Sequence, residues 1–138
     1  GPASVHAPPD SARCRQRSDS RVLMRIADRD ANRLELILQL IADIERRLAT
    51  MTIEMFLADR DERDLTAYRL ATIGEETRQL SDALKNRHDL PWIQIYGMRN
   101  VVFHDYVSVD PDLIWGVAKS RLAALEAMCR AELDQHPS

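Results

Sequence analysis

Residues 33–48 read RLELILQLIADIERRL and place an apolar side chain at every third or fourth position. On an α-helix this spacing gathers the apolar side chains into one stripe, while Glu35, Arg46 and Arg47 fall mostly outside it. The pattern predicts an amphipathic helix with one buried face, extending from about Arg21 to Ala49. The positions expected in its stripe are Leu34, Ile37, Leu38, Ile41, Ile44 and Leu48.

Further helical patterns follow toward the C-terminus. Residues 50–59 predict a break and a short helical turn, and residues 61–87 predict a second long helix. Gly74 lies inside that helix, where glycine costs roughly 1 kcal/mol relative to alanine. We therefore expect Gly74 to permit a close contact with another helix. The apolar positions of the second helix are Leu65, Tyr68, Leu70, Ala71, Ile73, Leu80 and Leu84.

Two prolines mark the remaining helices. Pro91 suits the first turn of a helix over residues 92–106, and Asp110 followed by Pro111 is typical of an N-cap and a first helical residue. The last helix is expected to reach about residue 133, with these side chains inside: Leu113, Ile114, Val117, Leu122, Leu125 and Met128. Because no strand pattern or repeat stands out, the predicted fold is an all-α antiparallel bundle of four to five helices.

The charge of the chain is distributed unevenly. The 138 residues carry a formal net charge of −3, and residues 1–29 hold six arginines and three aspartates, so that segment contributes +3 and the remainder −6. A protein that binds nucleic acid through a broad phosphate-contacting surface is basic over its folded part. The composition therefore excludes that class, and any action on RNA requires a local site.

The N-terminal segment differs from the rest. Residues 1–20 contain three prolines, several serines and arginines and almost no large apolar side chain, so they cannot bury enough surface to offset the entropy of ordering. We expect residues 1–20 to be a flexible tail and residues 21–138 to form one helical domain. The arginines of residues 13–29 are interpreted as a basic tail in preference to an RNA contact.

The cysteine positions and the shortness of the apolar runs indicate where in the cell the protein is located. Cys14 and Cys129 lie far apart and form no disulfide framework, and no spacing of Cys or His is typical of zinc. No apolar run approaches the ~20 residues of a membrane span, and the N-terminus lacks the apolar stretch of a secretory signal. We expect a cytoplasmic protein without membrane contact, metal or cofactor.

Residues 97–106, GMRNVVFHDY, concentrate the polar chemistry of the chain. They bring a guanidinium (Arg99), an amide (Asn100), an imidazole (His104) and a phenol (Tyr106) within eight residues. On an ideal helix Asn100 and His104 share a face, whereas Arg99 and His104 are rotated by roughly 140° from each other. That pair can still meet one substrate if the helix ends near His104 or if a second subunit faces it.

These groups suit the cleavage of RNA by transesterification. A neutral imidazole can accept the proton of the 2′-hydroxyl or protonate the leaving 5′-oxygen, and a guanidinium stabilises the charge that gathers on the phosphate oxygens. Asn100 can hold the imidazole or a phosphate oxygen. A simpler interpretation is also open, because an arginine and a histidine near a helix end commonly form a surface ion pair and interact favourably with the helix dipole.

The segment resembles the Arg-x4-His-x-Tyr motif of HepT-like toxins in the HEPN superfamily, with Arg99, His104 and Tyr106 at the three positions. The resemblance covers roughly residues 30–130 and extends to IGE at residues 73–75, LPW at 90–92 and IW at 114–115, a combination more specific than any one piece. It implies a homodimer whose paired motifs line a cleft between subunits and cleave RNA without a metal.

The same resemblance implies a partner and a modification. HepT-like toxins are encoded with a minimal nucleotidyltransferase antitoxin, which can neutralise the toxin by attaching AMP to the motif tyrosine. Tyr106 is the matching position, and AMP there would add bulk and negative charge beside Arg99 and His104. Asp105 departs from the family pattern, which commonly has glycine between the histidine and the tyrosine, and its carboxylate would repel a phosphate substrate.

Two other functions compete with the ribonuclease. Asp105 favours a catalytically weak HEPN-like dimer that docks a nucleotidyltransferase. The chain could itself be the nucleotidyltransferase, but we set this aside because it lacks a Gly-Ser pair followed by Asp-x-Asp. Other polar or aromatic residues receive structural interpretations: His88 at a helix C-terminus, Trp92 and Trp115 as core or interface anchors, and residues 59–64 as a solvated loop and helix start.

Overall fold

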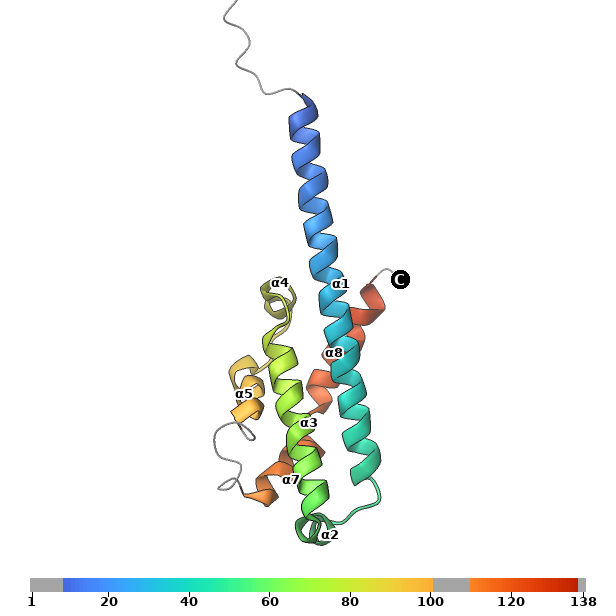
Figure 1. Cartoon of the computed structure of the whole chain (residues 1–138), viewed down its shortest axis with the longest axis vertical. Helices are drawn as coiled ribbons and strands as arrows, with labels where there is room; N and C mark the ends of the chain where they lie inside the picture. Colours follow the sequence, from blue (N-terminus) through green and yellow to red (C-terminus); the bar gives the residue numbers. More distant parts are fainter. Residues whose placement is uncertain (1–8, 101–109, 137–138) are drawn as a thin grey trace, which may run out of the picture.

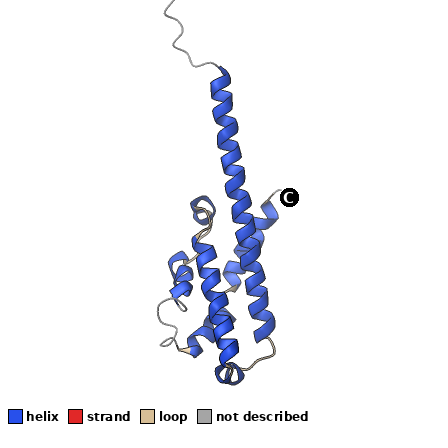
Figure 2. Cartoon of the chain, in the orientation of Figure 1, coloured by secondary structure: helices blue, strands red, loops and turns tan. Residues whose placement is uncertain are grey.

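The computed structural model describes the backbone of residues 9–100 and 110–136 and the side chains of residues 19–100 and 110–136. Within these ranges every regular element is helical and no strand occurs (Figure 2). In chain order the helices are α1 (Pro9–Leu48), α2 (Ile53–Ala58), α3 (Arg60–Arg78), α4 (Asp82–Asn86), α5 (Trp92–Tyr96), the 3₁₀ helix η1 (Gly97–Arg99), α7 (Pro111–Ser120) and α8 (Ala123–Gln135). The predicted all-α bundle is confirmed. None of these helices has the length and apolar character needed to cross a membrane.

The core lies between α1, α3 and α8, with α7 packed on α2 and α3 (Figure 1). The predicted stripe of α1 faces this core, and five of its side chains are at most 2% exposed: Leu34, Ile37, Ile41, Ile44 and Leu48. Leu38 lies at the margin of the stripe and is half-buried. The three- and four-residue spacing therefore identified the buried face of the longest helix correctly.

The N-terminal boundary of α1 differs from the prediction, because the helix begins at Pro9 and not near Arg21. Residues 10–20 contain no glycine or proline, so they can propagate a helix that the packed residues farther along already stabilise. Figure 1 shows this half of α1 projecting beyond the bundle, and the side chains of residues 19–25 are exposed. The predicted division after residue 20 falls inside a continuous helix, and the flexibility of residues 1–20 stays a prediction.

The helix predicted over residues 61–87 is divided in two. α3 ends at Arg78, and Ser81 caps α4, because its Oγ accepts a hydrogen bond from Leu84 N at 3.3 Å. Asp30 of α1 stabilises this break, since its carboxylate accepts hydrogen bonds from Ser81 N at 2.9 Å and from Ser81 Oγ at 2.5 Å. The last predicted helix is divided as well, at residues 121 and 122, so that α7 packs on α2 and α3 while α8 packs on α1.

The structure confirms the predicted cap of α7 but not the predicted burial of two side chains. Asp110 caps α7 with Pro111 as its first residue, as predicted. Tyr68 and Leu113, predicted in the core, are 63% and 59% exposed. Tyr68 points outward because, at about 100° per residue, it lies on the side of α3 opposite buried residues such as Thr66 and Leu70.

The acidic and basic run at residues 59–64 is more than a solvated loop. Asp59 caps α3 by accepting a hydrogen bond from Glu62 N at 3.1 Å. Glu62 is itself 9% exposed and binds the guanidinium of Arg47 through both carboxylate oxygens. Trp115 contacts Phe56 with ring centroids 5.2 Å apart, in agreement with its predicted role as a core anchor.

Candidate active site

Gly74 and the segment that carries Arg99 meet at the closest helix crossing near the predicted site. A Cβ atom on Gly74 would lie 2.9 Å from Arg99 N, 3.1 Å from Ile95 O and 3.3 Å from Met98 Cβ. Real carbon atoms do not approach a backbone so closely, so only glycine allows α5 and η1 to rest on α3 in this way. The predicted close contact at Gly74 is confirmed, and its partner is the backbone that holds Arg99.

The course of the chain before Arg99 differs from the prediction of one helix over residues 92–106. α5 begins at Trp92, as predicted, with Pro91 at the N-cap position, but it ends at Tyr96, where the 3₁₀ turn η1 follows. Met98 is 8% exposed and anchors η1 in the core, so Arg99 directly after it sits at the edge of the packed region. The segment 101–109 lies outside the described residues.

The guanidinium of Arg99 lies over the first turn past Gly74. Its Nε is 3.4 Å from Oε2 of Glu75, and 43% of the Arg99 side chain is exposed. The carboxylate thus orients a cation that still faces solvent, where a phosphate could reach it. The sequence analysis did not connect Glu75 with Arg99, although both belong to segments that resemble the HepT-like family.

Glu75 contacts more than one basic or amide group. Its Oε1 accepts hydrogen bonds from Arg78 Nη2 at 3.1 Å and from Gln79 Nε2 at 2.9 Å. The hydrogen bond with Arg78 and then that with Gln79 hold the pKa of Glu75 below its ordinary value, and the charge of Arg99 contributes in the same direction. Glu75 is therefore ionised at neutral pH and positions two guanidinium groups at once.

Lys85 adds a third cation on this side of α3. Its Nζ donates a hydrogen bond to the backbone oxygen of Arg78 at 3.1 Å and lies 5.0 Å from the centre of the Tyr96 ring. The Lys85 side chain is only 13% exposed, and its Nζ also lies 3.9 Å from a carboxylate oxygen of Asp82. Arg78 and Arg99, with side chains 53% and 43% exposed, are therefore the cations here that can attract an anion, although the body of the protein is acidic overall.

The remaining predicted site residues divide into two groups. Asn100 is exposed and ends η1, where its backbone N–H donates to the carbonyl groups of Gly97 and Met98. His104, Asp105 and Tyr106 lie outside the described residues. The predicted approach of His104 to Arg99 therefore stays a prediction. Among the described residues, no group of three or more His, Cys, Asp or Glu side chains is placed to hold a metal ion.

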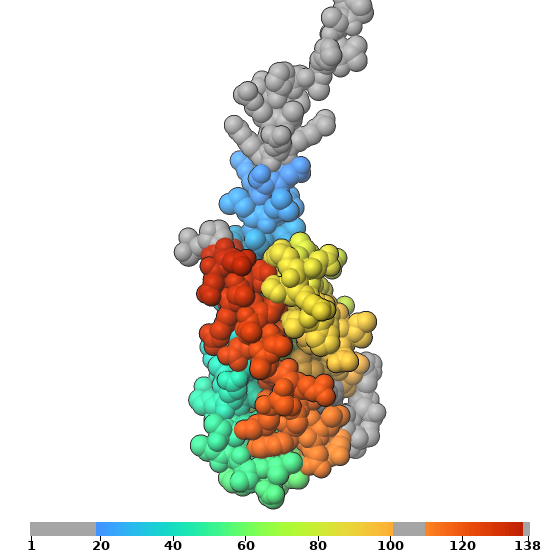
Figure 3. Space-filling model, turned by 180° about the vertical axis from the view of Figure 1, so that it is seen from behind, coloured from blue at the N-terminus to red at the C-terminus, as the bar shows by residue number. Residues whose placement is uncertain are grey.

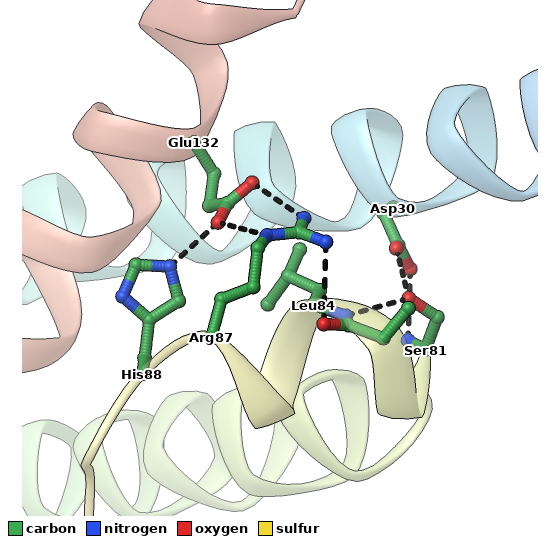
Figure 4. Close-up of polar contacts among 7 residues, drawn as sticks. Asp30, Ser81, Leu84, Arg87, His88 and Glu132 are labelled. Carbon is green, nitrogen blue, oxygen red and sulfur yellow. Dashed lines mark hydrogen bonds and ion pairs between the residues drawn. The ribbon is translucent and has the colours of Figure 1, made fainter.

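A second polar cluster lies at the C-terminal end of α4, where Arg87 and His88 contact α8 (Figure 4). Glu132 of α8 accepts hydrogen bonds from Arg87 at 3.2 and 2.9 Å, and His88 Nε2 lies 2.6 Å from Glu132 Oε1. Figure 4 shows the carboxylate of Glu132 between the two basic side chains, with Asp30 and Ser81 at the next turn. We assign these contacts a structural role, because they join α4 to α1 and α8. His88 follows α4, as expected for a helix C-terminus, but Glu132 is the partner that the sequence did not reveal.

Comparisons with known proteins identify the family to which the chain belongs. A family model described as "Ribonuclease HepT-like" matches residues 37–132. The "Probable ribonuclease HepT" of Thermococcus cleftensis is 29% identical over 94 residues, which cover 67% of this chain and 86% of the relative. The "Putative RNase TTE0752" of Caldanaerobacter subterraneus is 28% identical over 103 residues, covering 74% and 92%. No solved structure matches the chain significantly. Because the family match spans more than half of its length, the chain belongs to the HepT-like ribonuclease family.

Proposed function

We propose that this protein is a metal-independent endoribonuclease in which Arg99 and His104 act on one RNA phosphodiester. The observation that carries the proposal is the position of Arg99. Its backbone is seated on Gly74, its guanidinium is held by Glu75, and nearly half of its side chain remains open to solvent. A surface ion pair alone would not indicate catalysis. Because the chain belongs to a ribonuclease family, an exposed guanidinium at this position is suited to bind an RNA phosphate.

The proposed reaction is an internal transesterification. The neutral imidazole of His104 accepts the proton of a ribose 2′-hydroxyl, and the 2′-oxygen forms a bond to the adjacent phosphorus. The bond from phosphorus to the 5′-oxygen breaks, and that oxygen takes a proton from solvent water. The hydroxide formed then removes the proton that His104 had accepted, which restores the neutral imidazole. Arg99 stabilises the negative charge that builds on the non-bridging oxygens, and Asn100 donates a hydrogen bond to one of them. The products are a 2′,3′-cyclic phosphate and a 5′-hydroxyl.

The proposal includes a homodimer and a partner. Two copies of the motif, one from each subunit, would line a shared cleft. A minimal nucleotidyltransferase antitoxin would neutralise this toxin by attaching AMP to Tyr106, which lies two residues beyond His104. The added negative charge would compete with an RNA phosphate for Arg99. These statements rest on the resemblance of the Arg99–Tyr106 segment to HepT-like toxins.

Cleavage of a labelled RNA by the purified protein in excess EDTA tests the catalytic proposal. Arg99→Ala and His104→Ala should each lower the rate by roughly 10²- to 10⁴-fold, the range typical of lost transition-state stabilisation and lost acid–base catalysis. The matched control is Arg46→Ala, because Arg46 is an exposed arginine of α1 with a side chain 66% exposed. Wild-type rates in both site variants would show that the proposal is wrong.

A different outcome would favour the docking function suggested by Asp105. In that case the wild-type protein binds a nucleotidyltransferase but does not cut RNA, and Asp105→Gly restores cleavage. The intact mass of protein produced together with its nucleotidyltransferase tests the modification. We expect an increase of one or more AMP units that disappears in Tyr106→Phe, whereas an unmodified but neutralised complex would show inhibition by steric blocking.

A further inference from the structure

Three arginines repeat along the projecting half of α1. Arg21, Arg25 and Arg29 are all exposed, and none forms an ion pair with another residue that the structure describes. We refer to residues 19–33, which contain them, as the arm. Figure 3 shows from behind that the N-terminal part of the arm rises clear of α4 and α8. Arg21 and Arg25 are therefore open to solvent, whereas Arg29 lines the hollow where α1 meets α3.

The spacing of these arginines is regular. Each step of four residues advances about 6 Å along a helix and turns by about 40°, so the three guanidinium groups form a slowly winding line on one side of the arm. Like charges at this spacing repel one another and weaken an isolated helix. Asp28 lies on the same side of the arm, but its carboxylate pairs with His136 at 3.3 Å. The three arginines have no ion-pair partner among the described residues, so the line is suited to a partner that carries a series of negative charges.

The line of arginines leads toward the candidate active site. Arg33, one further step along α1, binds Glu76 of α3 through an Nη1–Oε2 contact of 2.8 Å. Glu76 follows Glu75, the residue that positions Arg99. At this junction the surface is hollowed, and the hollow is lined by Arg29, Asn32, Arg33, Leu36 and Glu76. A strand lying along the arm would therefore arrive beside the helix that supports Arg99.

The arm has a different charge from the body of the protein. Residues 1–29 carry +3 and the remainder −6, so the body alone would repel a polyanion. The family match begins at residue 37, after the arm. The arm itself, residues 19–33, holds four arginines and three aspartates, so it contributes +1 whereas residues 34–138 carry −6. The sequence predicted a helix from about Arg21, although the arginines of residues 13–29 were interpreted as a basic tail, and the structure places Arg21, Arg25 and Arg29 on α1.

We propose that the arm is a binding surface for the backbone of single-stranded RNA, which it holds so that the chain passes toward Arg99. The inference rests on the proposed function in that RNA is the substrate. Each of Arg21, Arg25 and Arg29 contacts a phosphate, and RNA binding relieves the repulsion among them. The added RNA should therefore increase the helix content of the protein.

The test measures binding of a fluorescein-labelled 20-nucleotide 2′-O-methyl RNA, which the proposed reaction cannot cleave because its nucleophile is blocked. The arm variant carries Arg21→Gln, Arg25→Gln and Arg29→Gln. The control variant carries Arg46→Gln, Arg60→Gln and Arg130→Gln, which remove the same charge from body arginines with side chains 66%, 82% and 64% exposed. Both triple variants should keep the fold, since glutamine is a good helix former.

We expect the arm variant to bind roughly 10- to 100-fold more weakly at 0.1 M salt. Its slope of log affinity against log salt should be smaller by about 2, from three contacts at about 0.7 each. The affinity of the control variant for RNA should stay within about twofold of the wild-type value. RNA should increase the helical circular dichroism signal at 222 nm only when the arm is intact. Equal weakening in both variants, or wild-type affinity in the arm variant, would overturn the inference; the second result would point to a protein partner.

The two proposals fail separately in this design. Arg99→Ala should abolish cleavage of ordinary RNA while the intact arm still binds the blocked RNA. If the wild-type protein binds the blocked RNA through the arm but cuts nothing, the ribonuclease proposal fails and the arm stands. If cleavage depends on Arg99 but the arm variant binds and cuts like wild type, the arm proposal fails alone.

Discussion

Substitution of Gly74 by alanine directly tests the close contact between α3 and the backbone that holds Arg99. The new Cβ would lie 2.9 Å from Arg99 N and 3.1 Å from Ile95 O, whereas ordinary contact begins near 3.4 Å. Both atoms belong to the backbone and cannot rotate away. The segment formed by α5 and η1 would therefore have to move off α3 by about 0.5 Å, the difference between 3.4 and 2.9 Å.

The energetic consequence combines two opposed effects. Alanine is favoured over glycine inside a helix by about 1 kcal/mol, whereas forcing an extra carbon into a packed contact costs about 1–3 kcal/mol. Gly74→Ala should therefore lower the free energy of unfolding by roughly 0–2 kcal/mol. Because a 1 Å misplacement of a catalytic group can cost about 100-fold in rate, a shift of about 0.5 Å at Arg99 should lower kcat/KM about tenfold.

Gly116→Ala provides a matched control. Gly116 also lies inside a helix, α7, but a Cβ atom there would meet nothing within 4 Å. This variant should gain about 1 kcal/mol of stability from helix propensity alone and cleave RNA at the wild-type rate. The assay is urea denaturation for stability and initial-rate cleavage of a labelled RNA for activity. If Gly74→Ala were stabilised as much as Gly116→Ala and kept full activity, the close crossing that positions Arg99 would be refuted.

Three further outcomes are expected. Hydrogen bonds from Arg87 and then from His88 hold the pKa of Glu132 below its ordinary value. The ionised carboxylate therefore stabilises the fold above about pH 4.5, and this contribution is lost as pH falls through the lowered pKa. Glu132→Gln should accordingly lower the free energy of unfolding by about 1–3 kcal/mol in denaturant titrations at pH 7, and by little at pH 3. Asp30→Ala removes both hydrogen bonds to Ser81 and should cost about 2–4 kcal/mol in the same assay, a loss that Asp30→Asn recovers in part. Burial raises the pKa of Cys129 to about 12, so its thiol should react slowly in the folded protein. Peptide mapping after treatment with a thiol reagent at pH 8 should find Cys129 unmodified until the protein is unfolded. Rapid modification of the folded protein would contradict the burial of Cys129.

Features that arise from local periodicity were predictable from the sequence. The stripe from Leu34 to Leu48 repeats with the period of a helix, and its buried face follows directly. Asp110 with Pro111 is a local signal, because capping involves residues within one turn. Gly74 could be recognised as a contact point, but its partner could not, since the backbone around Arg99 lies about 25 residues farther along the chain.

The features that the sequence concealed depend on contacts between distant residues. The break between α3 and α4 requires Asp30, which lies 51 residues before Ser81. The contact of Glu132 with His88 joins residues 44 apart. Neither separation leaves a pattern in a single sequence. Of the candidate site, the motif was visible in the chain, whereas the support of Arg99 by Glu75 emerged only from the way η1 crosses α3.

The polar attachment of α4 has a consequence for how the molecule opens. This short helix buries one large apolar side chain, Leu84, and is otherwise held by Asp30 on α1 and Glu132 on α8. A unit fastened by hydrogen bonds and little apolar area detaches at a lower free energy than the core helices do. Backbone amides of residues 81–90 should consequently exchange with deuterium before those of residues 34–48, so local opening begins at this end while the rest of the bundle stays closed.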